Sequence, residues 1–176
     1  MVLFTDDDRL ADPRPMMPRL PRGASVILRS KQAIDDTTAR AVLQTARTHH
    51  LKLLIAGDVK LAHRIGADGV HLPSAMLHAL PKLRRLYPRL LFSAACHNDQ
   101  ALRLAAQGGA DAAFLSPLFA TRSHPDAPTL GVIQARRMLR DTSLAVYGLG
   151  GINTKTASCL RSLPLVGFGA IDGWLA

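Results

Sequence analysis

The sequence predicts a (β/α)8 TIM barrel, and a repeated phrase gives the first reason. The segment GADGVHLPS begins at Gly66, and GADAAFLSP begins at Gly109, 43 positions later. Each copy indicates the end of a helix, a tight turn and then a buried strand. The interval between the copies therefore holds two strand–helix units of about 21 residues each.

The second reason is that strand-like apolar runs alternate with helical patterns along the whole chain. This alternation predicts a parallel sheet that is buried on both faces and has right-handed connections. Eight units are present if the run from Val2 is the first strand. No GxGxxG motif follows that run, which argues against a dinucleotide-binding fold. The strands are expected at residues 2–6, 24–29, 51–57, 69–72, 91–95, 112–115, 144–149 and 165–171.

The helices are predicted from their apolar spacing and their capping residues. Ala39, Val42, Leu43 and Ala46 follow the i, i+3, i+4, i+7 pattern of one buried helix face. Aspartates and asparagines precede the helices as N-caps, glycines end them, and Pro81 kinks or restarts one of them. The helices are expected at residues 35–50, 58–66, 74–87, 100–109, 130–140 and 154–163.

The predicted barrel is a single domain, residues 1–176, and it is trimmed, because typical barrels of this class run to about 250 residues. Four prolines between residues 13 and 21 argue against a regular first helix. The sequence stops at Ala176, where an eighth helix would begin. Two neighbouring parts of the barrel wall would then be thinly covered. We expect a second copy of the chain to cover them, as a homodimer.

Charge and composition limit the kinds of partner. The net charge is +9 and the pI is near 10.6, which favours an anionic partner. The basic residues are scattered and no aromatic residues are interleaved with them, so a nucleic acid is not expected. No apolar run approaches the roughly 18 residues of a membrane span. Cys96 and Cys159 form no CxxC pair and the N-terminus lacks a basic region, which together favour the cytoplasm.

Side chains that suit an anion follow the predicted strands at their carboxyl ends, where barrel enzymes carry their sites. Arg29 and Lys31 follow the second strand, and His97 follows the fifth. His71 ends the fourth strand and either contacts a ligand or is a satisfied core histidine. Glycines follow strand seven and lie in strand eight, and their backbone N–H groups suit a phosphate. These glycines are Gly150, Gly151 and Gly169. The pattern predicts a phosphorylated small-molecule ligand.

Five phrases in order connect the chain to a known family. LRSK matches the family's QxRxK, GADGVHLP matches GADGVHLGQED, and SAACH matches GVSTH. GADAAFLSPLFATRSH matches GADYVGLGPIFPTxTK, and YGLGGIN matches AIGGI. From about residue 24 to residue 174, the chain resembles thiamine phosphate synthase and its relative, the thiazole tautomerase.

The resemblance implies an enzyme of thiamine biosynthesis, a transferase that joins hydroxymethylpyrimidine pyrophosphate to thiazole phosphate and releases pyrophosphate. It implies Mg²⁺ as cofactor. By resemblance Arg29 and Lys31 bind pyrophosphate, and His97 lines the pyrimidine pocket. The candidate catalytic residues are Lys31, His97 and His124. The candidate phosphate-binding residues are Thr121, Ser123, Gly131, Gly150, Gly151 and Gly169.

The chain departs from the family pattern at the metal site. The two aspartates that the family uses for the metal fall on Gly57 and Met76, and neither offers the carboxylate oxygens that Mg²⁺ prefers. Asp58 is one place away and is the candidate replacement. The run Asp6–Asp8 is a second source of carboxylates, although a solvated turn is the simpler interpretation of it.

Three functions therefore stay open. The first is a thiamine phosphate synthase whose lost ligands are replaced by other carboxylates. The second is a metal-independent enzyme acting on thiazole phosphate or another phosphorylated heterocycle, with His97 or His124 as general acid–base. The third is a non-catalytic binder of thiamine intermediates. The chain alone does not choose among them, because one fold supports many activities.

Overall fold

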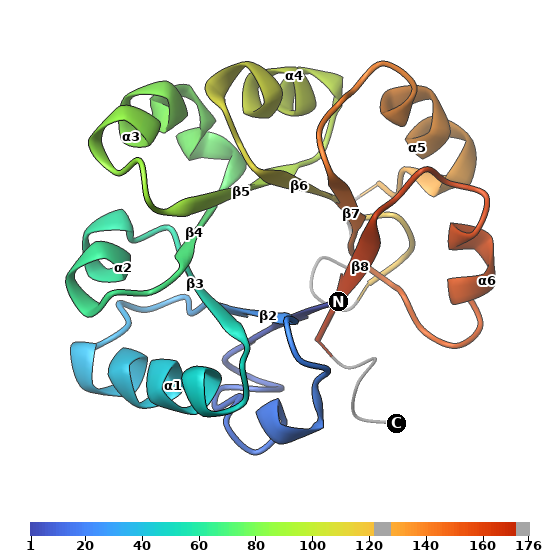
Figure 1. Cartoon of the computed structure of the whole chain (residues 1–176). Coiled ribbons are helices and arrows are strands. Elements are labelled where there is room, and N and C mark those ends of the chain that lie inside the picture. The colour runs from blue at the N-terminus through green and yellow to red at the C-terminus, as the bar shows by residue number, and fades with distance from the viewer. Residues whose placement is uncertain (122–127, 172–176) are drawn as a thin grey trace.

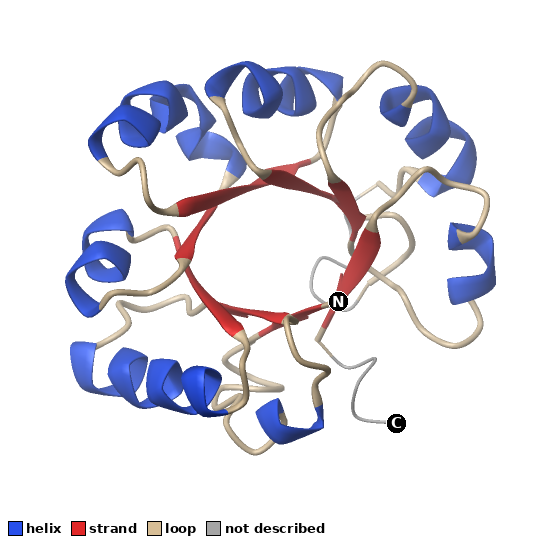
Figure 2. Ribbon diagram, in the orientation of Figure 1, coloured by secondary structure: helices blue, strands red, loops and turns tan. Residues whose placement is uncertain are grey.

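The computed structural model describes residues 1–121 and 128–171, and it forms a closed barrel of eight parallel strands in the order β1 to β8. Figures 1 and 2 show the strands as an inner ring with the helices outside it. The predicted (β/α)8 barrel is therefore confirmed. The strands are β1 (Val2–Phe4), β2 (Ser25–Leu28), β3 (Lys52–Ala56), β4 (Gly69–Leu72), β5 (Leu91–Cys96), β6 (Ala112–Leu115), β7 (Val146–Gly148) and β8 (Gly167–Ala170).

Helices connect the strands on the outside of the barrel. Three of the α-helices in the described residues begin at a side-chain cap: Asp35, Asp58 and Asn98 each accept an N–H from the first turn that follows, and Asp35 and Asn98 are among the predicted caps. None of the helices in the described part of the chain has the length and apolarity to cross a membrane. The helices are α1 (Asp36–Thr48), α2 (Val59–Ile65), α3 (Leu80–Leu86), α4 (Asp99–Gly108), α5 (Gly131–Leu139) and α6 (Ala157–Leu160), with 3-10 turns η1 (Met17–Arg19) and η2 (Ser74–Ala79).

The connection between β1 and β2 is irregular, as the prolines predicted. Its one helical turn is η1, with Pro18 at the start. Pro81 likewise stands in the first turn of α3, directly after η2, so it restarts the helix there. Residues 172–176 lie outside the described residues. The prediction that helix eight is missing concerns that part of the chain.

The last helix is shorter than predicted. A helix was expected over residues 154–163, but α6 holds only residues 157–160. The Asn153 carboxamide oxygen accepts the N–H groups of Lys155 and Thr156 at 2.9 and 3.2 Å, which closes a turn before the helix can begin.

The repeated GAD phrase has the same structural role in both copies. Gly66 and Gly109 end α2 and α4 in the left-handed conformation, with φ of 75° and 83°. The aspartates that follow, Asp68 and Asp111, accept the backbone N–H groups of Leu53 and Phe92 at 2.8 and 2.7 Å. Each aspartate thus ties the start of its own strand to the start of the preceding one.

The barrel interior is filled by one inward-pointing set of strand side chains. Val2, Phe4, Ile27, Leu54 and Phe114 form this inner cluster, and a larger cluster lies between the strands and the helices. A hollow of about 140 Å³ opens at the amino ends of the strands. The predicted site residues lie at the opposite rim, where the strands end.

Candidate functional site

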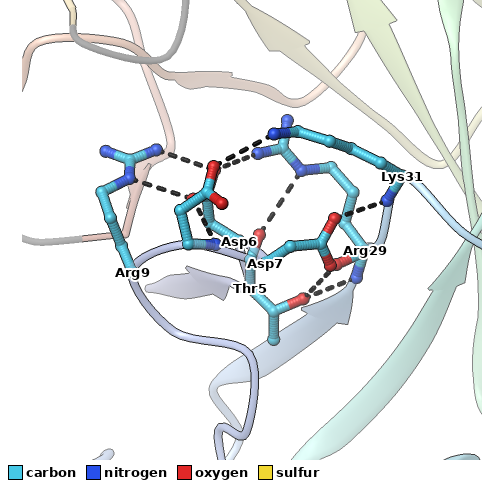
Figure 3. A network of polar contacts seen from close by, with 7 residues as sticks. Thr5, Asp6, Asp7, Arg9, Arg29 and Lys31 are labelled. Carbon is cyan, nitrogen blue, oxygen red and sulfur yellow. Dashed lines mark hydrogen bonds and ion pairs between the residues drawn. The ribbon is translucent and has the colours of Figure 1, made fainter.

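Strand β2 delivers Arg29 to the carboxyl-terminal rim of the barrel. The buried Thr5 hydroxyl accepts the Arg29 N–H and donates to the Arg29 carbonyl, both at 2.7 Å. The Arg29 guanidinium contacts the Asp6 carboxylate at 2.9 Å (Figure 3). The ends of β1 and β2 are therefore fixed to each other, and the arginine head is held over the rim.

Lys31 lies two residues further along, in a more exposed position. Its ammonium contacts the Asp8 carboxylate at 3.0 Å, and its backbone N–H donates to Asp7 at 2.7 Å. The Lys31 and Asp8 side chains are both 74% exposed. Exposed pairs of this kind contribute little stability, so an incoming anion can replace Asp8 at low cost.

His97 follows β5 and contacts the residue after β6. Its Nδ1 lies 2.8 Å from the Ser116 carbonyl oxygen. A carbonyl oxygen only accepts, so Nδ1 carries a proton, and in the neutral ring Nε2 is left as the acceptor. The imidazole is exposed and oriented, which suits contact with a substrate or transfer of a proton.

The loop after β7 presents backbone N–H groups at the same rim. Gly150 and Gly151 have φ of 90° and 67°. A Cβ at Gly151 would lie 2.4 Å from the Ala120 carbonyl oxygen, so only glycine fits there. Within residues 1–121 and 128–171, neither glycine N–H has a hydrogen-bond acceptor. Two unpaired N–H groups at successive residues suit an anionic oxygen.

The other two candidate glycines have structural tasks. Gly131 starts α5, and its N–H already donates to the Leu118 carbonyl at 3.0 Å, so that donor is engaged within the fold. Gly169 lies inside β8, where a Cβ would meet the Phe4 ring at 2.7 Å. Packing inside the barrel accounts for that glycine.

His71 lies inside the barrel and is shielded from solvent. Its Nδ1 lies 3.0 Å from the Ser93 hydroxyl, and its ring packs edge-on against Phe4 and Phe114. Burial, with a smaller effect from the nearby Arg29 and His97 charges, lowers the pKa of His71 to about 3. Of the two interpretations of His71 given by the sequence, the neutral ring therefore fits the core histidine with a satisfied hydrogen bond.

Three of the predicted site residues lie in the loop after β6. Thr121 is described and has an interaction partner. Ser123 and His124 lie outside the described residues.

Cys96 is buried at the end of β5, and burial raises the pKa of its thiol to about 12, as suits a packing residue.

The described residues do not fit a magnesium ion at the expected place. Gly57 and Met76 supply no carboxylate, and the Asp58 carboxylate caps α2 by accepting the Leu61 N–H at 2.8 Å. In the described part of the chain, no three His, Cys, Asp or Glu side chains are grouped as metal ligands. Hard cations need several oxygen ligands, and the described residues do not gather such a set here.

The sequence misled about the exposure of Asp6. It also carried no signal that Ser93 is the partner of His71 and that Ser116 is the partner of His97. A solvated turn was expected for Asp6–Asp8, but Asp6 is only 8% exposed. Its carboxylate is bound by arginines, and the hydrogen bond from Arg9 is the main reason that its pKa falls to about 2. A signal was available: an aspartate at the end of a first strand faces the arginine that ends the second, because parallel neighbours are in register.

Comparison with known proteins decides the family. A family model described as Thiamine monophosphate synthase matches residues 17–170 of this chain. The chain belongs to the thiamine monophosphate synthase family.

Individual relatives support the same family assignment. The chain is 32% identical to the putative thiamine-phosphate synthase 2 of Aquifex aeolicus, over 65% of this chain and 61% of that protein. It is 30% identical to the thiamine-phosphate synthase of Lactococcus lactis subsp. lactis, over 76% of this chain and 61% of that protein. It is 32% identical to the thiamine-phosphate synthase of Coprothermobacter proteolyticus, over 85% of this chain and 73% of that protein.

A solved structure supports the fold. The thiamine phosphate pyrophosphorylase from Pyrococcus furiosus superposes with a TM-score of 0.83 at 20% identity, covering 97% of this chain and 84% of that one. The chain spans about three fifths of the length of its A. aeolicus and L. lactis relatives. The synthase family is generally Mg²⁺-dependent. The resemblance implies that its metal-binding aspartates fall on Gly57 and Met76 in this chain.

Proposed function

We propose that the protein is a thiamine phosphate synthase-type transferase, which condenses hydroxymethylpyrimidine pyrophosphate with thiazole phosphate. The observation that supports this most is the family match together with Arg29 and Lys31 at the carboxyl-terminal rim. In the proposed reaction the bond between the pyrimidine methylene carbon and the pyrophosphate oxygen breaks. Pyrophosphate leaves with the electron pair, and the thiazole nitrogen forms the new bond to that carbon.

In this proposal each residue contacts one part of the two substrates. Arg29 and Lys31 hold the departing pyrophosphate, where positive charge stabilises the negative charge that develops. Exposed His97 contacts the pyrimidine, with Nε2 free to accept a hydrogen bond. The N–H groups of Gly150 and Gly151 hold the thiazole phosphate. Thr121, with Ser123 and His124 of the same loop, completes the phosphate contacts.

A second candidate is favoured by the missing carboxylates at Gly57 and Met76. In that case the barrel keeps its anion site and acts without metal on thiazole phosphate or a similar heterocycle. His97 then serves as general acid–base, because its ring is oriented by Ser116. A protein that binds thiamine intermediates without turnover is the remaining alternative that this departure supports.

A turnover assay by mass spectrometry tests the proposal. The purified protein is incubated with the pyrimidine pyrophosphate and thiazole phosphate, once with Mg²⁺ and once with EDTA. Thiamine phosphate is expected with Mg²⁺. Product of equal yield in EDTA would favour the metal-independent enzyme. No product in either arm, at an enzyme concentration equal to that of the substrates, would refute the transferase.

We also propose that the protein is a cytoplasmic homodimer. Cys96 and Cys159 are free thiols, as suits a reducing compartment. Met1 and Val166 are large exposed apolar residues near the junction of β1 and β8, where covering helices were expected to be lacking. Light scattering should give about twice the chain mass of 19.0 kDa. A mass equal to one chain at micromolar concentration would rule the dimer out.

A further inference from the structure

The hollow at the amino ends of the strands lies at the opposite end of the barrel from Arg29 and His97. Figure 2 shows the ring of strands from which its lining side chains come. Its volume is about 140 Å³. An engineered apolar cavity of about 150 Å³ in another protein takes up benzene. The hollow is therefore large enough for one aromatic ring.

Small side chains at inward positions leave this space open. Side chains alternate along a strand, so Ser25 faces the interior together with Ile27, and Ala112 faces it together with Phe114. Ser25 and Ala112 each stand at the first position of their strand. Barrels of this class usually fill such layers with bulky branched side chains. Here a serine and an alanine leave part of the lowest layer unfilled.

The walls of the hollow are mostly apolar and aromatic. Ile27, Leu54 and Phe114 are buried residues of the inner cluster and line it. The Tyr147 ring stacks on Phe114, with 5.2 Å between the ring centroids and 23° between the ring planes. Burial of apolar surface is the main favourable contribution in such a pocket. The walls therefore suit the body of an aromatic molecule.

The polar groups of the hollow leave a positive charge open to a ligand. Within residues 1–121 and 128–171, the side chains of Ser25, Lys52 and Tyr147 have no hydrogen-bond or ion-pair partner. Ser25 and Lys52 are register partners on β2 and β3, so they lie at the same end of the barrel. Asp111 also lines the hollow, but its carboxylate is paired with the Arg84 guanidinium. An anionic group at the mouth would meet the exposed Lys52 ammonium.

We propose that this hollow is a binding site for a small aromatic carboxylate, a molecule of the size of benzoate. Its ring lies between Ile27, Leu54 and the stacked aromatic pair. Its carboxylate faces Lys52, and the hydroxyls of Ser25 and Tyr147 are further donors. The site is separate from the proposed transferase site, and it does not rest on the proposed function.

The test is calorimetric titration of the full chain with sodium benzoate. Saturable binding is expected with a Kd of about 1 mM, which is ordinary for so small a ligand. Lys52→Gln should raise Kd about 3- to 10-fold, because the lost charge is an exposed one. Lys60→Gln, an exposed change on α2 that removes the same charge, should bind as the wild type does. Ala112→Leu and Ser25→Leu fill the hollow and should each abolish binding.

Amide chemical shifts of the wild type locate the ligand without any substitution. They should move at Ile27, Leu54 and Tyr147 and stay unchanged at His97. Shifts confined to the carboxyl-terminal rim, or no saturable binding, would overturn the site. So would unchanged binding in Ala112→Leu and Ser25→Leu, once thermal unfolding has shown both variants to be folded.

A second ligand tests the charge. Benzylamine carries the same ring with a positive group, and it should bind far more weakly than benzoate. Equal binding of the two ligands, or an unchanged Kd for benzoate in Lys52→Gln, would overturn the anionic assignment. All of these outcomes leave the proposed transferase untouched, because that function is measured by turnover at the other rim.

Discussion

Replacing Lys31 by alanine is expected to lower the rate of thiamine phosphate formation about 100-fold, the usual effect of removing one group that stabilises developing negative charge. The Asp8 carboxylate beside Lys31 raises the pKa of its ammonium, so the charge is present throughout the neutral range. The same pair is largely exposed, and therefore its loss should leave the unfolding temperature nearly unchanged. Steady-state kinetics and thermal unfolding of one preparation check both statements.

A control for this variant is Lys82→Ala. Lys82 is exposed on α3, away from the rim residues after β2, and its removal lowers the net charge by the same amount. Lys31→Ala should lose activity while Lys82→Ala keeps it. Equal rates for wild type and Lys31→Ala would show that Lys31 is not part of the site. An equal loss in both variants would show that only overall charge matters.

Acidification is expected to destabilise the fold through His71. In the unfolded chain this histidine has the ordinary pKa of 6.5, whereas burial lowers it to about 3 in the folded chain. Between these values the unfolded chain binds the proton and the folded chain does not. The contribution of neutral His71 to the free energy of unfolding is therefore complete well above pH 6.5 and is lost as the pH falls toward 3. Near pH 4 the free energy of unfolding has fallen by about 3 kcal/mol through this group.

Urea unfolding at several pH values measures this loss, and a variant isolates the part that His71 contributes. His71→Gln keeps a polar group beside Ser93 but does not titrate, so its stability should fall less steeply between about pH 7 and pH 4. His78→Gln, an exposed change in η2, should follow the wild type. Parallel curves for wild type and His71→Gln would contradict the assigned burial of this ring.

The order of elements was predictable because its signals are local. Apolar runs, capping residues and left-handed glycines act over a few positions, so α1, α2 and α4 begin and end close to their predicted places. The prolines before residue 21 excluded a regular helix for the same reason. Residues 154–156 were misassigned to a helix, because the Asn153 turn competes for the same backbone donors.

The sequence also placed Arg29, Lys31 and His97 at the ends of their strands, since parallel strands in a barrel end at one rim. It did not decide what each group contacts. Asp6 and Arg29 are 23 positions apart, and His71 and Ser93 are 22 apart, so neither pairing has a local signal. The same holds for Gly169, whose place is decided by the Phe4 ring on the neighbouring strand.

By itself, then, the sequence determined the barrel, the irregular connection after β1 and the rim on which the cationic groups stand. The tertiary structure alone decided that Asp6 is buried between two arginines and that His71 is a neutral ring inside the barrel. The physical reason is that burial and charge pairing depend on which distant strands become neighbours. Closing the barrel brings the ends of β1 and β2 together, and only then does a run of aspartates become the partner of the basic groups opposite.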